Sequence, residues 1–198
     1  MLILSYWRID AAPIPNDYTI NDIRSAAPEY NQSYELLHSI LDKNDNSQDK
    51  YAIGLSEEDL NNLLEIHDIS KENDLQVISQ KIKEKEQDIL ALWDKAKKGR
   101  DIFERLDSFP EIADLSEPYI NIPYTKDLKE LLYLYQNYIC LQSINGNHEQ
   151  AFNELSMLDS IFKKMSLNAR SIIMKLICEA CFKTDHFLLN FMIITSGL

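Results

Sequence analysis

The sequence holds little glycine, proline or cysteine. Its 198 residues include 4 Gly, 6 Pro and 3 Cys. A fold of many short strands needs turn-forming glycine and proline, and a fold held by disulfides needs paired cysteines, so the composition argues against both. Abundant Leu, Ile, Glu, Lys and Asp favour helices instead. We predict an all-α protein, as an irregular helical bundle or a short α-α superhelix of antiparallel helix pairs.

Basic residues are also few, and they are unevenly placed. The formal net charge is −12. Residues 1–80 carry 5 basic and 15 acidic side chains, whereas residues 81–100 carry 7 and 4. A mostly acidic surface repels a phosphate backbone, so we expect no nucleic-acid partner. For the basic stretch 95–100 we expect a solvated helix face, with contact to an anionic partner as the alternative.

The chain contains no hydrophobic run long enough to cross a bilayer. Residues 1–7 are apolar but too short, and no basic residue precedes them as in a secretory signal. We therefore expect a cytoplasmic protein in which residues 1–18 form an extended N-terminal arm. The alternative is that the true N-terminus lies upstream. Residues 1–7 would then end a transmembrane helix, and the rest would be the soluble portion of a membrane-anchored protein with a membrane-proximal linker.

The first half of the chain, residues 19–117, is predicted to be helical. We expect helices over about 29–41, from 57 to near 67, over 71–98 and, briefly, over 110–115. Ser56 and Asp59 fit a capping box for the second of these, and Ser70 is the expected N-cap of the third. The third has neither Gly nor Pro and should be the longest helix. Its polar middle, residues 80–88, should project into solvent or contact a partner.

The second half, residues 124–198, opens with a helical hairpin. Two helices are joined at Asn145-Gly146-Asn147, where Gly146 suits the left-handed residue after a helix and Asn147 suits the next N-cap. The first helix is apolar nearly all round, which predicts burial between neighbours. We expect the two halves to pack as one domain.

Residues 134–158 of this hairpin resemble a tetratricopeptide-type repeat. The match comprises Tyr135, Tyr138, Ile139, Gly146, Gln150-Ala151, Leu155 and Leu158. Ile139 and Leu158 depart from the small residues usual in that family. The resemblance covers about residues 125–165 and implies a helical surface that holds a peptide or protein partner. An ordinary antiparallel helix hairpin is the alternative.

Two further apolar segments follow the hairpin. Ser166 is the expected N-cap of a helix that reaches about Lys183, and a separate apolar run follows over Phe187–Ile194. These two segments would form the next helix pair of an array, in truncated form.

We predict a non-enzymatic helical protein-interaction or scaffold domain that needs no cofactor. It has no catalytic residues by this interpretation, and its partner is a protein or peptide. Aromatic rings with polar tips are favoured anchors in recognition, although they also pack in cores. The candidate partner-binding residues are Tyr124, Tyr133, Tyr135 and Tyr138.

A metal-binding or enzymatic helical bundle is the alternative function. Cys178 and Cys181 lie one helical turn apart and His186 follows, but thiols in mid-helix are more typical of buried structural cysteines. Glu35 and His38 have the spacing of di-iron bundle ligands, but the chain has no second such pair. We therefore predict no metal site.

Overall fold

The computed structural model describes residues 28–41, 53–72, 74–113, 125–169 and 172–196. These residues form helices and no strand, which confirms the predicted all-α class. The elements in chain order are α2 (Pro28–His38), the 3-10 helix η1 (Ser39–Leu41), α3 (Glu57–Ile69), α4 (Leu75–Glu84), α5 (Glu86–Lys95), α6 (Lys97–Asp107), α7 (Thr125–Ile144), α8 (His148–Asn168) and α9 (Ile172–Ser196). The predicted arm over residues 1–18 lies outside the described residues.

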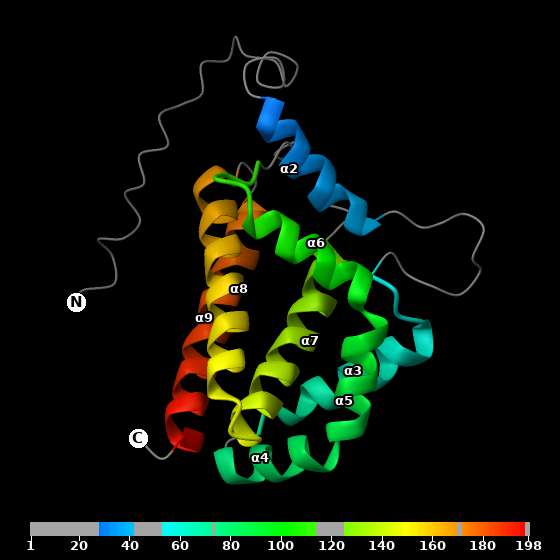
Figure 1. Ribbon diagram of the computed structural model, residues 1–198, viewed down its shortest axis with the longest axis vertical. Helices are drawn as coiled ribbons and strands as arrows, with labels where there is room; N and C mark the ends of the chain where they lie inside the picture. The colour runs from blue at the N-terminus through cyan, green and yellow to red at the C-terminus, as the bar shows by residue number, and fades with distance from the viewer. Residues whose placement is uncertain (1–27, 42–52, 73, 114–124, 170–171, 197–198) are drawn as a thin grey trace.

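The three longest helices lie side by side, with α7 next to α8 and α9 (Figure 1). The shorter helices α3, α4 and α5 cover another side of α7, while α6 contacts α8 and α2 crosses α6. Buried apolar side chains from both halves of the chain belong to one hydrophobic cluster. Among the helices described, none is long and apolar enough to span a membrane.

The local signals at two helix ends are confirmed. At the start of α3, the Ser56 hydroxyl accepts from the Asp59 amide at 3.1 Å, and the Asp59 carboxylate accepts from the Ser56 amide at 3.0 Å. At the end of α7, Gly146 has φ +79°, and the amides of Gly146 and Asn147 donate to the carbonyls of Ser143 and Gln142. This is the pair of bonds of a Schellman motif, which satisfies the last carbonyls of the helix.

The predicted single helix over 71–98 is wrong. Ser70 is the C-cap of α3, and the chain then forms three short helices with breaks at Lys85 and Ala96. Asn145, in the α7–α8 turn, accepts from Lys83 at 2.6 Å and donates to Glu86 at 2.8 Å. The polar middle of the expected helix therefore wraps around the end of the α7–α8 hairpin, because only a bent chain keeps its apolar side against α7.

Two other boundaries also differ from the prediction. Residues 110–113 are not helical, and the Ala113 amide donates instead to the Ser33 hydroxyl of α2 at 3.1 Å. Ser166 lies inside α8, and α9 is one continuous helix rather than two segments. Asp185 interrupts the apolar pattern of α9 but is itself buried, so the helix continues through it. The expected second helix pair is not formed.

Two glycines with positive φ offer a direct test of this packing. A Cβ atom at Gly54 (φ +93°) would lie 2.6 Å from the Lys95 carbonyl oxygen, whereas one at Gly146 would meet nothing within 4 Å. Left-handed backbone costs a residue with a Cβ about 1–2 kcal/mol, and overpacking adds about 1–3 kcal/mol. Gly54→Ala should therefore lower the free energy of unfolding, measured in urea, by more than Gly146→Ala. Equal losses would show that Gly54 does not lie against α5.

Candidate protein-interaction surface

Two of the tyrosines predicted for recognition lie inside the bundle. Tyr135 is 1% exposed and Tyr138 is 5% exposed. The Trp93 ring of α5 stacks on Tyr138, with ring centroids 3.6 Å apart, and meets Tyr135 edge-on at 4.9 Å. The Arg100 guanidinium lies 4.4 Å from the Trp93 ring centroid, and its Nε donates to the Trp93 carbonyl. In this structure the Trp93 ring joins α5 to α7, and Arg100 joins α6 to α5.

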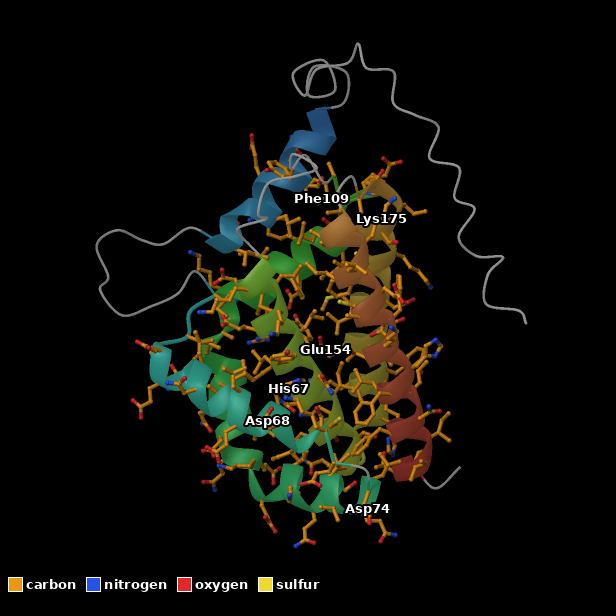
Figure 2. The ribbon with its side chains drawn as sticks, turned by 180° about the vertical axis from the view of Figure 1, so that it is seen from behind. His67, Asp68, Asp74, Phe109, Glu154 and Lys175 are labelled. Carbon is orange, nitrogen blue, oxygen red and sulfur yellow. The ribbon has the colours of Figure 1, made fainter. Side chains whose placement is uncertain are left out.

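The third described tyrosine is half-buried. Tyr133 stacks on His67 of α3, with ring centroids 3.4 Å apart, and the Lys129 ammonium lies 5.4 Å from the Tyr133 ring centroid. Figure 2 shows His67 in the middle of the molecule, where α3 faces α7. Burial, with a smaller contribution from the charge of Lys71, lowers the pKa of His67 to about 4, so the imidazole is neutral at neutral pH. Tyr124 lies outside the described residues.

The structure does not bring the possible metal ligands together. Cys178 and Cys181 are buried thiols on the inner side of α9, whereas His186 is exposed on the same helix. Burial raises the pKa of the Cys181 thiol, which keeps it protonated. Glu35 is exposed on α2. Among the described residues, no group of three or more His, Cys, Asp or Glu side chains could hold a metal ion.

An exposed apolar surface lies instead on α8 and α9. Phe152 is 55% exposed, Leu189 40%, Ile193 50% and Ile194 57%. We call these four residues the C-terminal apolar surface. From Phe187 to Ser196 the chain carries no charged residue. Contiguous exposed apolar side chains of this kind mark interaction sites more often than singly scattered ones do.

The register of α8 against α9 places these residues at one level. Asp159 of α8 lies close enough to Asp185 of α9 to influence its ionisation. Phe152 precedes Asp159 by two helical turns, and Leu189 and Ile193 follow Asp185 by one and two turns. Because α8 and α9 are consecutive helices that run antiparallel (Figure 1), Phe152 is at the same level of this helix pair as Leu189 and Ile193.

The sequence pattern alone does not single out this surface. It identifies Phe187–Ile194 as an apolar run but does not decide which side of α9 is covered. The one available signal is that residues 187–196 carry no charge. A helix exposed to water usually has charged residues on its outer side, so their absence indicates an outer side that is apolar.

Comparison of the chain with protein-family models, with curated proteins and with solved structures finds no significant match.

Replacing Tyr135 tests whether its ring packs in the core or serves to bind a partner. Tyr135→Ala should lower the free energy of unfolding by about 3–5 kcal/mol, because a large buried ring leaves a cavity. The same change at the half-buried Tyr133 should cost less. Urea unfolding followed by circular dichroism measures both. A Tyr135→Ala protein as stable as the parent would show that this ring is not part of the core.

The buried carboxyl group of Asp185 makes stability depend on pH. It is 8% exposed, and its Oδ2 atom has no hydrogen-bond partner among the described residues. Burial, and then the charge of Asp159, raise the pKa of Asp185 to about 7, while Lys163 acts in the opposite direction. The ordinary pKa of an aspartate is near 3.8, so between about pH 4 and pH 7 the Asp185 carboxyl group is ionised in the unfolded chain but still protonated in the folded one. The free energy of unfolding is therefore highest below about pH 4 and decreases as the pH rises to about 7.

Asp185→Asn should therefore stabilise the protein at pH 8 by about 1–3 kcal/mol, with a gain that shrinks toward pH 5. Urea unfolding at both pH values measures the difference. Asp94→Asn is the control, because Asp94 is exposed and the described structure gives it no ion pair. A gain that is the same at both pH values would contradict the proposed titration of Asp185.

Proposed function

We propose that this chain is a non-enzymatic helical interaction domain that pairs with a second copy of itself through the C-terminal apolar surface. The observation that carries the proposal is the cluster of four exposed apolar side chains on adjacent parts of α8 and α9, where residues 187–196 of α9 carry no charge. Water contact with these side chains is unfavourable, and a matching apolar surface removes it.

The gain from pairing can be compared with its cost. Burying a Leu, Ile or Phe side chain completely is worth about 1.5–3 kcal/mol, so a side chain that starts half exposed gains about 1 kcal/mol. The eight such side chains of two copies gain roughly 8 kcal/mol, against an association cost of about 4–15 kcal/mol. These two quantities are similar, so the pair is expected to depend strongly on protein concentration.

The charge distribution makes this surface the one where a second copy meets the least repulsion. Two chains that each carry a net charge of −12 repel one another over most of their surfaces. Repulsion is weakest where neither partner presents a carboxylate, and residues 186–196 contain none. An unrelated basic partner would gain from the acidic parts of the surface instead, and it would gain nothing from this uncharged part.

The surface is also compatible with two-fold pairing. In such a dimer the same patch meets itself, so each group must be able to face its own copy. Apolar side chains satisfy this condition, and so does the amide of the exposed Asn190, which can donate to and accept from an identical amide. Two α8–α9 hairpins placed face to face would form a four-helix arrangement, a packing that helical proteins use widely.

The test is the effect of a charge in the surface on the mass in solution. The parent chain should show twice its monomer mass of 23.0 kDa at high concentration in size-exclusion chromatography with light scattering. Ile193→Glu should weaken the pair by about a hundredfold or more, because it places like charges opposite each other in an apolar contact. Added salt should strengthen pairing of the parent, because it screens the repulsion between the acidic chains.

Leu176→Glu is the matched control. Leu176 lies on the same helix, is 56% exposed and is far from the C-terminal apolar surface along α9, so its replacement should leave pairing unchanged. Circular dichroism should show both variants folded. A parent chain that stays monomeric up to millimolar concentration overturns the proposal, as does equal disruption by the two variants.

A further inference from the structure

A hollow between η1 and α6 lies apart from the C-terminal apolar surface. Its residue Ser39 directly follows the end of α2, which points away from α8 and α9 in Figure 1. It has a volume of about 420 Å³ and is lined by Ser39, Lys97, Lys98, Asp101, Ile102 and Arg105. That volume falls within the range of sites that hold small molecules, about 300–1,000 Å³. We call it the α6 hollow.

The charges that line the α6 hollow are not balanced. The Lys97 ammonium lies 2.7 Å from both carboxylate oxygens of Asp101, so these two charges offset each other. Lys98 and Arg105 have no ion pair among the described residues. They are seven positions apart on α6, which places them two turns apart on the same side of the helix. The hollow thus carries a net charge of +2 in an acidic protein.

Lys98 and Arg105 differ from most lysines of the described structure, although Lys129 and Lys175 also form no ion pair with Asp or Glu among the described residues. Ten lysines of the described ranges form ion pairs with Asp or Glu, as expected for a chain with 32 acidic residues. Lys98 and Arg105 have no such pair and lie beside the same hollow. A phosphomonoester, which carries about −1.5 to −2 at neutral pH, matches this charge.

The remaining lining residues suit an organic group with hydroxyls. Ile102 is 5% exposed and supplies an apolar wall. The Ser39 hydroxyl already donates its hydrogen to the Leu36 carbonyl at 2.6 Å, so its oxygen can only accept a further hydrogen bond. Asp101 also accepts only, while Arg105 presents the forked donor group that binds phosphate oxygens in pairs. The hollow therefore offers donors for a phosphate and acceptors for hydroxyl groups.

We propose that the α6 hollow binds a small phosphorylated polyol, such as a sugar phosphate, with Lys98 and Arg105 on the phosphate and with Ser39 and Asp101 on its hydroxyl groups. The site does not depend on the pairing of two copies, so either proposal can fail without the other.

The test is calorimetric titration of the full chain with three probes: glucose 6-phosphate, inorganic phosphate and glucose. Glucose 6-phosphate should bind at least tenfold more tightly than inorganic phosphate, and glucose should not bind measurably. The Ile102 methyl signals in a ¹³C-methyl NMR spectrum should shift during the titration, which locates the ligand in the hollow. No binding, or equal affinity for the two phosphates, overturns the proposal.

Variants show which cations are responsible. Lys98→Gln combined with Arg105→Gln should weaken binding of glucose 6-phosphate by at least tenfold. Lys175→Gln removes one exposed lysine from the upper part of α9 in Figure 2, away from the hollow, and should leave binding unchanged. Both altered cations are exposed, so folding is expected to be retained and is checked by the Ile102 signals. An equal loss in the Lys175 variant would mean that only net charge matters, which overturns the proposal.

Discussion

The fold depends on the enclosure of α7. Ten consecutive residues of this helix, 134–143, are all buried, so this part of the helix has no side that faces water. A helix buried all round needs neighbours on every side. α8 and α9 provide them on one part of its circumference, and α3, α4 and α5 on the rest. The segment after α3 therefore has to curve around α7, which explains the breaks at Lys85 and Ala96.

Enclosing α7 also carries a cost. The helix brings polar groups into the interior: Asn137 is 1% exposed and neither polar atom of its side chain has a hydrogen-bond partner among the described residues. Burial also raises the pKa of Glu130, which is 4% exposed. An unsatisfied buried group costs about 1–3 kcal/mol. The aromatic contacts of Trp93 with Tyr135 and Tyr138 act in the opposite direction, since stacked and edge-on rings add to the gain from burial.

Both proposed sites lie on surfaces that the enclosure of α7 does not use. α9 covers α7 and α8 with its inner side only, which leaves Leu189, Ile193 and Ile194 outside. α6 uses its apolar side, including Phe103, against the core and presents Lys98 and Arg105 outward. The first surface suits an apolar partner and the second an anion, because a side chain that the core does not need remains free to meet another molecule.

The sequence by itself determined the all-α class, the capping box at Ser56 and the turn at Gly146, because these depend on composition or on residues within a few positions of each other. Only the tertiary structure decided where the chain bends near Lys85, because the contact with Asn145 spans about 60 positions. It also decided that Tyr135 is covered and Ile193 is not. Both side chains are apolar enough for a core, and which one is buried depends on the helices that pack beside it.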